Sequence, residues 1–300
     1  MNRIAVLMGG VSAEREVSLT TGRAVCEALT KLGYAVDPID VGPDIPALAA
    51  RLTPAPDAAF NALHGRFGED GCIQGLLELM GIPYTHSGIR ASALAMDKAA
   101  AKAVFRTAGI AVPDGKVVCC GDAHDSMPPP YVVKPVSEGS SVGVIIVEEG
   151  SNAVPLSPET WPFGSRVLVE RYIPGRELTV AVNDGQALGL LEIRPYQGFY
   201  DYDTKYTEAR ADHLVPAPVD DDVAAEALDM AERAHAALGC RSVTRADFRY
   251  DEHGGGLYLL EVNTQPGLTP LSLVPEIAAW AGIDFPSLVQ LMTEAARCDF

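Results

Sequence analysis

The 300-residue sequence lacks several features that would assign it to a special class of protein. It has no apolar run near the roughly 20 residues that a membrane-spanning helix needs, and its first residues enter an expected strand without the apolar stretch of a signal peptide. No internal repeat or low-complexity tract occurs either. From these absences we expect a globular protein that works in the cytoplasm and contacts no membrane.

Positive charge is also scarce, with 23 Lys and Arg against 40 Asp and Glu and a formal net charge of −17. Nucleic acids and anionic membranes are recognised by basic patches, so we expect neither as a partner. The six cysteines include no CxxC pair, which favours scattered reduced thiols without a catalytic role. A Walker phosphate-binding sequence is missing too.

Short apolar strands alternate with helical stretches in the first third of the chain. Residues 4–8 and 58–63 have strand composition, and helices are expected at 16–32 and 74–80. This alternation predicts a parallel α/β sheet, whose ligand-binding groups gather at the carboxyl ends of the strands.

Two further regions follow. The second opens with an expected helix, and its expected strands cover 131–134, 142–147 and 167–170. The third holds an aromatic-rich loop, an amphipathic helix, a hairpin and a terminal helix. We therefore divide the chain, which has enough residues for several cores, into 1–93, 94–177 and 178–300.

The hairpin of the third region is the most informative local feature. Residues 242–250 alternate polar and apolar side chains, and a glycine turn joins them to a second strand. Pairing that is symmetric about the turn sets Phe248 opposite Leu260 and Ala246 opposite Val262, which gives a coherent apolar face.

The polar face of the same hairpin carries facing acids. Its pairing sets Asp247 opposite Glu261 and Arg245 opposite Asn263. Like charges that face each other destabilise a ladder unless something neutralises them. Because two carboxylates and an amide oxygen suit Mg²⁺, we predict a metal site, with a solvated sheet face as the alternative.

Two loops are candidates for contacts with phosphates. Lys134 ends a strand and is followed by the Gly/Ser-rich segment 137–143, which permits close backbone approach, although a plain hairpin would have the same composition. The segment 195–212 contains four of the ten tyrosines and favours a packed lid, to which Lys205 and Tyr206 would bring a cation and a phenol.

Other candidates have equally simple structural explanations. Residues 170–173 could read an adenine edge and Glu177 could hold a ribose, but an exposed charged edge has the same pattern. Glu14 near a helix start is favoured by the helix dipole alone, and His64 could be a satisfied histidine. Lys98 lies at the helix end that disfavours a cation, which hints at another role.

Taken together, the motifs resemble the ATP-grasp superfamily and, within it, the D-alanine–D-alanine ligases, over essentially the whole chain. The matching runs are 8–18, 62–66, 68–71, 96–98, 133–135, 138–143, 199–202, 205–206, 260–264 and 272–275. The resemblance implies an α/β fold of three regions. An N-terminal parallel α/β domain comes first, and ATP is held between central and C-terminal α+β domains.

The resemblance also implies the activity. A ligase of this family joins two D-alanine molecules through an acyl phosphate, at the expense of ATP, for peptidoglycan synthesis. The expected cofactors are ATP and two Mg²⁺ ions, which Mn²⁺ can replace. The expected partners are D-alanine, ATP and a second copy of the chain in a homodimer.

Carried over position by position, the resemblance implies these site residues. The first D-alanine would be held by Glu14, linked through Ser140 to Tyr206. ATP would be contacted by Lys98, Lys134, Glu170, Arg171, Tyr172, Ile173, Glu177, Phe199 and Lys205. The phosphoryl group in transfer and the tetrahedral state would be stabilised by Arg245, the Gly267 amide and His64. The second D-alanine would bind Ser272 and Leu273. The metal ions would bind Asp247, Glu261 and Asn263.

Three alternatives stay open at this point. Ligases that add D-lactate or D-serine depart from the Lys-Tyr lid sequence, which is retained here at Lys205 and Tyr206. Another ATP-grasp carboxylate–amine ligase would lack the run 12–18, and a non-catalytic nucleotide-binding regulator would lose Arg245 or a metal ligand. One visible departure from the family is Gln265, where many members carry Ser, and another is the short segment between residues 117 and 131.

Overall fold

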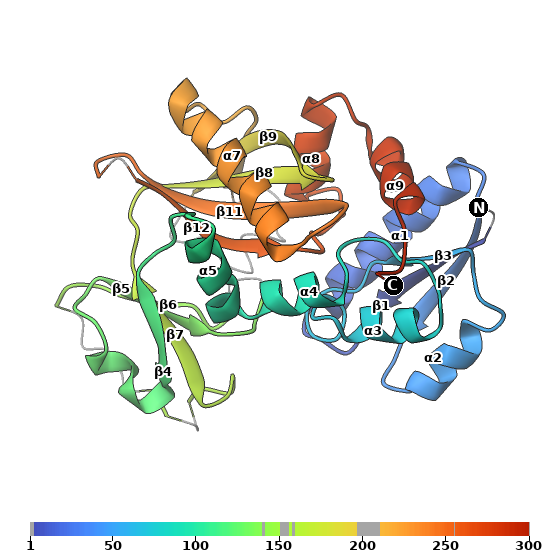
Figure 1. The fold of residues 1–300 in the computed structure, drawn as a ribbon, viewed down its shortest axis with the longest axis horizontal. Helices are drawn as coiled ribbons and strands as arrows, with labels where there is room; N and C mark the ends of the chain where they lie inside the picture. Colours follow the sequence, from blue (N-terminus) through green and yellow to red (C-terminus); the bar gives the residue numbers. More distant parts are fainter. Residues whose placement is uncertain are drawn as a thin grey trace.

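The structure is a computed structural model that describes residues 3–139, 142–150, 156–157, 160–196, 211–254 and 256–299. Three β-sheets follow one another along the chain, and helices lie beside and between them (Figure 1). The first sheet has strand order β2-β1-β3, the second β4-β7-β5-β6 and the third β10-β9-β8-β11-β12.

The first sheet is parallel throughout, as the strand–helix alternation predicted. Residues Ile4 to Leu7 of its central strand are fully buried, which explains their continuous apolar composition. The elements of this region are β1 (Arg3–Gly9), α1 (Arg15–Lys31), β2 (Ala35–Val41), α2 (Ile45–Arg51), β3 (Ala58–Asn61), α3 (Cys72–Leu79) and α4 (Ile89–Met96).

The second sheet is small and antiparallel. Its core is small and packs two aromatic side chains, Tyr131 and Trp161, with valines such as Val169. The strand expected at 142–147 is shorter than predicted and begins only at Ile145. The elements are α5 (Lys98–Thr107), β4 (Gly115–Cys119), the 3₁₀ helix η1 (Cys120–Asp125), β5 (Tyr131–Pro135), β6 (Ile145–Val147) and β7 (Arg166–Arg171).

The third sheet is antiparallel, and helix α7 crosses one of its faces (Figure 1). That helix ends at Leu238, and its C-cap Gly239 has a left-handed φ of 73°, as helix C-caps commonly do. The elements are β8 (Arg176–Asn183), β9 (Gln186–Pro195), β10 (Ala211–Leu214), α7 (Asp221–Leu238), β11 (Val243–Asp251), β12 (Gly256–Asn263), α8 (Leu273–Trp280) and α9 (Phe285–Glu294).

Two hydrophobic cores join parts of the chain that are far apart in sequence. Val25 of α1 shares a core with Ile277 of α8 and Leu288 of α9, so the first and third regions pack together. Phe105 of α5 shares another core with Phe248 of β11. Helix α5 therefore packs against the third sheet, although the predicted boundaries assign it to the second region.

The hairpin of β11 and β12 confirms the polar half of the predicted register. Asp247 faces Glu261 and Arg245 faces Asn263. The predicted pairing of Phe248 with Leu260 is wrong, because the register shifts after Asp247 and Phe248 faces Leu259 instead. Such a β-bulge bends the strand and redirects a side chain.

The bulge has a direct consequence for ligand binding. Leu259 is fully buried in the core, whereas Leu260, the extra residue, lines a pocket on the other face of the sheet. A hydrophobic residue that the sequence pattern assigns to the core is therefore available to a ligand.

Two expected absences can be compared with the described residues. All six cysteines are free thiols, as predicted. Among the helices in the described ranges, none has both the length and the apolar character that crossing a bilayer would require.

A glycine between β7 and β8 provides a test of the packing around this hairpin. Gly175 has φ of 97°, and a Cβ built on it would lie 2.1 Å from the Tyr250 carbonyl oxygen. We expect Gly175→Ala to lower the free energy of unfolding by about 2–4 kcal/mol in urea denaturation.

The matched control is Gly185→Ala, in the turn between β8 and β9. Gly185 has φ of 83°, and no atom lies within 4 Å of a Cβ built on it. Gly185→Ala should therefore cost only the backbone strain of a left-handed alanine, about 1–2 kcal/mol. Equal losses for Gly175→Ala and Gly185→Ala would contradict the close backbone contact.

Candidate active site

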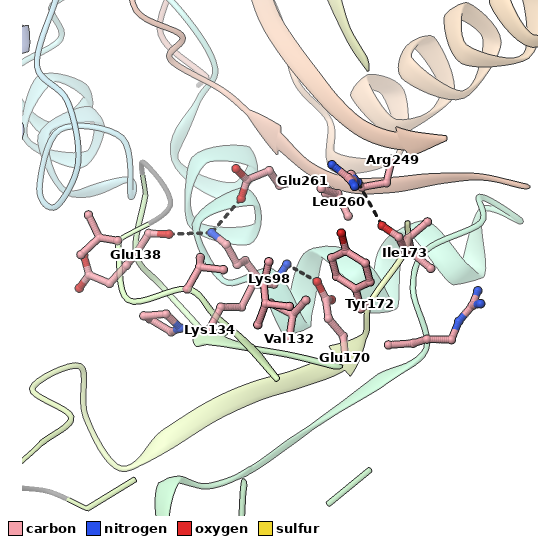
Figure 2. Close-up of a pocket in the computed structure, with 15 residues that line it drawn as sticks. Lys98, Val132, Lys134, Glu138, Glu170, Tyr172, Ile173, Arg249, Leu260 and Glu261 are labelled. Carbon is pink, nitrogen blue, oxygen red and sulfur yellow. Dashed lines mark hydrogen bonds and ion pairs between the residues drawn. The ribbon is translucent and has the colours of Figure 1, made fainter. Parts of the chain in front are cut away.

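A pocket lies between the second and third sheets (Figure 2). Val132 and Ile146 line it from the second sheet, and Leu260 lines it from the third. These apolar side chains suit a flat aromatic ring. Charged side chains that suit phosphates line the same pocket, notably Lys98 and Lys134.

Lys98 connects this pocket to the hairpin. Its Nζ lies 2.9 Å from Glu261 Oε2 and donates to the Glu138 carbonyl oxygen at 2.7 Å. Burial by itself would lower the pKa of Lys98, but the Glu261 carboxylate outweighs burial and raises it. Lys98 is therefore a permanent cation at the start of α5. Its pairing with Glu261 is a role that explains a lysine at the helix end where the dipole disfavours positive charge.

The other end of the pocket is formed by the last residues of β7 and the residues that follow it. Glu170 is 2% exposed and forms ion pairs with Lys134 and with Lys102. The next residues are held by Arg249, whose Nε donates to the Ile173 carbonyl at 3.1 Å. The predicted adenine-contacting residues therefore do line one pocket, with Lys98 and Lys134 on its walls.

Glu177, the predicted ribose ligand, binds Arg249 at the edge of this pocket, and its contact with a ribose stays a prediction. Arg249 Nη1 donates to Glu177 Oε1 at 2.9 Å, and Arg249, not Glu177, lines the pocket. The structure thus places Glu177 beside the pocket, next to the lining residue Arg249.

A second, more polar pocket begins where the first one ends. Glu261 lines both pockets. The second pocket gathers predicted residues from the first and third regions, namely Glu14, His64, Arg245, Glu261, Asn263, Gly267, Ser272 and Leu273. Side chains that are separated by up to about 260 positions in the sequence therefore surround one cavity.

The predicted metal ligands are neutralised by side chains. Arg245 donates to both oxygens of Asp247 at 2.8 Å, and Thr179 and Asn263 donate to the same carboxylate at 2.7 and 3.0 Å. The facing Glu261 has Lys98 as its cation. The requirement for positive charge between facing carboxylates is thus met by Arg245 and Lys98.

The donor chemistry of the hairpin still fits a hard cation, since it consists of carboxylate and amide oxygens. Within the described ranges, however, no group of three or more His, Cys, Asp or Glu side chains converges as a metal site would require. Asn263 also presents its NH₂ group to Asp247, not its oxygen. A metal ion would have to displace Arg245 from Asp247 and Lys98 from Glu261.

Glu14 lies where two glycines approach it. A Cβ built on Gly65 would come within 2.6 Å of Glu14 Oε2, and one built on Gly139 within 3.3 Å. Gly65 has φ of 69°, so it satisfies both the close approach and the left-handed backbone. The segment predicted to bind phosphates thus reaches Glu14 at Gly139.

Buried His64 and half-buried Glu69 form a pair of titratable groups, with His64 Nδ1 4.0 Å from Glu69 Oε1. Burial, with a smaller contribution from the Arg245 charge, lowers the pKa of His64 to about 4. Its Nε2 lies 3.1 Å from Thr21 Oγ1. His64 is therefore neutral at physiological pH, so any stabilisation of an anion by its ring would come from a hydrogen bond and not from a positive charge.

Ser272 and Gly267 lie together at the start of α8. A Cβ built on Gly267 would come within 2.9 Å of Ser272 Oγ, which also accepts from the Thr269 backbone N–H at 3.0 Å. The Ser272 side chain does not cap the helix. The first N–H groups of α8, beginning with Leu273, are thus oriented as an anion-binding helix start.

Four predicted site residues lie outside the described residues. They are Ser140, Phe199, Lys205 and Tyr206. Their assignments to the first D-alanine, to ATP and to the lid therefore stay predictions.

Three residues without a predicted role are part of the site's framework. Glu69 lines the second pocket, Lys102 pairs with Glu170, and Gln265 accepts from Asn61 Nδ2 at 2.7 Å and donates to the Leu63 carbonyl. Gln265 thus ties the third sheet to the first. Only Lys102 had a sequence signal, since it lies one helical turn after Lys98.

The structure has three successive sheets, with one pocket between the second and third sheets. This pocket continues into a polar pocket that lies against the first region. This arrangement defines the ATP-grasp class. Family models named "D-ala D-ala ligase C-terminus" and "D-ala D-ala ligase N-terminus" match residues 107–294 and 44–87. The chain therefore belongs to the D-alanine–D-alanine ligase family.

Individual relatives agree with this assignment. D-alanine–D-alanine ligases from Acidiphilium cryptum and Rhodospirillum rubrum are 57% and 55% identical over 99% of both chains. Two crystal structures of the Bacillus anthracis enzyme are 34% identical and cover 98% of this chain. The one with ATP has a TM-score of 0.81 and the other 0.85, and the chain covers 96% and 97% of them.

Glu69 leads to a testable pH dependence of stability. Burial and then the nearby Glu14 raise the pKa of Glu69 to about 8 from 4.5. The folded state therefore keeps a proton that the unfolded chain releases near pH 4.5, and native stability falls as the pH rises from about 4.5 to about 8.

Glutamine has no ionisable proton, so we expect Glu69→Gln to abolish the decrease in stability between about pH 4.5 and pH 8. The difference in free energy of unfolding between Glu69→Gln and the unchanged protein should increase in favour of Glu69→Gln by on the order of 2–4 kcal/mol from pH 5 to pH 9, measured by urea denaturation. The exposed Glu16→Gln is the control and should follow the unchanged protein. Parallel curves for Glu69→Gln would contradict a protonated Glu69.

Proposed function

We propose that this chain joins two D-alanine molecules to D-alanyl-D-alanine at the expense of ATP, through an acyl-phosphate intermediate. The observation that carries the proposal is the junction at Glu261, which lines both pockets and binds Lys98. A nucleotide in the first pocket would place its terminal phosphate at this junction. A carboxylate substrate in the second pocket would meet it there.

The chemistry requires such a junction. A carboxylate oxygen of the first D-alanine attacks the γ-phosphorus, and the bond to ADP breaks. The amine of the second D-alanine then attacks the acyl carbon, loses its extra proton, and inorganic phosphate leaves. Because water would hydrolyse the acyl phosphate, the two steps need adjoining, closed pockets.

The charged residues of the site divide between the two substrates. Lys98 and Lys134 would hold the ATP phosphates, and Arg245 with the Gly267 amide would stabilise the phosphoryl group and the tetrahedral state. Glu14 would bind the ammonium of the first D-alanine. The roles of Ser140, Phe199, Lys205 and Tyr206 belong to the same proposal.

The second D-alanine would bind at the start of α8. Ser272 and the Leu273 backbone N–H would hold its carboxylate, because the uncapped N–H groups of a helix start favour an anion. This position keeps the carboxylate away from Glu14 and directs the amine toward the junction.

We further propose Mg²⁺ as the metal, with Asp247, Glu261 and Asn263 as its ligands. When bound, Mg²⁺ neutralises the phosphate oxygens during transfer. In its absence Arg245 and Lys98 form ion pairs with Asp247 and Glu261. A homodimer, a cytoplasmic location and the supply of peptidoglycan precursors complete the proposal, from family membership.

The primary test is phosphate release from ATP with D-alanine, D-lactate, D-serine or L-alanine as substrates. We expect release with D-alanine alone to yield the dipeptide. D-lactate and D-serine, offered as second substrates beside D-alanine, should give little mixed product. Absence of D-alanine-dependent release would overturn the proposal, and a preference for D-lactate or D-serine would make the chain a ligase of that kind.

The metal assignment has its own variant. We expect Glu261→Gln to raise the Mg²⁺ concentration for half-maximal turnover at least about tenfold and to lower kcat on the order of 10²-fold, because a ligand and the Lys98 partner are both lost. Glu252→Gln, an exposed glutamate of the same hairpin, is the control. An unchanged Mg²⁺ dependence in Glu261→Gln would remove it from the ligand set.

A further inference from the structure

Lys102, on the buried side of α5, is a charged residue that the proposed reaction does not use. It is 1% exposed, and its Nζ lies 3.0 Å from Glu170 Oε2. In the described part of the chain Lys102 Nζ has no hydrogen-bond partner, so this ion pair is its main polar contact. An ammonium group without water needs a strong reason to be buried.

The two lysines that contact Glu170 differ in their access to a ligand. Lys134 lines the nucleotide pocket and pairs with Glu170 Oε1. Lys102 pairs with the other oxygen and does not line the pocket. Lys134 is thus within reach of phosphates, whereas Lys102 lies outside the pocket lining and pairs with Glu170.

A bound nucleotide would therefore change the surroundings of Glu170. Once phosphates attract Lys134, the carboxylate loses one of its two cations. Burial raises the pKa of Glu170, and the charges of Lys134 and Lys102 outweigh burial and hold it below its usual value. With Lys134 turned to phosphate, Lys102 would be the cation that keeps Glu170 ionised.

The ionisation state of Glu170 decides which base it can recognise. An ionised carboxylate only accepts hydrogen bonds, whereas a protonated one can also donate. A 6-amino purine presents a donor to this group, and a 6-oxo purine presents an oxygen that an ionised carboxylate repels. A site built to bind an amino group leaves its own acceptor unpaired when that group is missing.

We propose that Lys102 is a positioning residue that fixes Glu170 as an ionised acceptor and thereby makes the pocket select 6-amino over 6-oxo purine nucleotides. The inference rests on the proposed function only in placing the base beside Glu170. It does not depend on D-alanine or on turnover.

The test measures nucleotide binding directly, by calorimetry with ATP and ITP in the absence of D-alanine. We expect the unchanged protein to bind ATP at least about 100-fold more tightly than ITP. Lys102→Met keeps the length and apolar stem of the side chain. It should weaken the binding of ATP at least about tenfold and change the binding of ITP by no more than about threefold. The ratio of the ATP affinity to the ITP affinity therefore falls about threefold or more.

The control is Lys116→Met, which removes an exposed lysine from β4 of the same sheet and should leave both affinities unchanged. If Lys102 had a purely structural role, Lys102→Met would weaken the binding of ATP and ITP equally, and this result would overturn the inference. So would equal binding of ATP and ITP by the unchanged protein. Circular dichroism melting establishes that each variant is folded.

A second variant covers the case in which Lys102→Met does not fold. Glu170→Gln has an amide that both accepts and donates, so the ATP to ITP affinity ratio should fall about tenfold or more. A ratio that stays unchanged in this variant contradicts the inference. Because binding is the readout, a protein that binds ATP selectively but releases no phosphate would contradict the proposed function and leave the role of Lys102 standing.

Discussion

The facing pair of Asp247 and Glu261 is the constraint on which the site depends. Two carboxylates opposite each other on neighbouring strands repel, so the fold must bring cations to them. Arg245 comes from the same strand as Asp247, but Lys98 reaches Glu261 from the start of helix α5. Satisfying this one pair therefore fixes helix α5 against the third sheet and closes the end of the nucleotide pocket.

The buried charges form a chain across the two pockets. Lys98 joins Glu261 at the junction, and Lys102, one turn further along α5, joins Glu170 at the far end of the nucleotide pocket. Phe105 anchors the same helix in the core of the third sheet. One amphipathic helix thus positions cations at both ends of the proposed ATP site, and its apolar side sets their distance from the hairpin.

Much of this arrangement could be predicted from particular residues. The alternation of polar and apolar side chains predicted the hairpin and the pairing of Asp247 with Glu261. The β-bulge could not be predicted, because one extra residue changes the register without changing the composition, and it moved Leu260 from the expected core to the pocket.

The sequence by itself determined the family, the parallel first sheet and many, but not all, of the residues that surround the polar pocket, because these follow from local periodicity and from motifs in a fixed order. Only the tertiary structure decided the electrostatic state of the site. Neutral His64, the raised pKa of Glu69 and the pairing of Lys102 with Glu170 each arise from burial and from charges that are distant in sequence. Desolvation and Coulomb interactions depend on three-dimensional distance, which no local pattern of residues encodes.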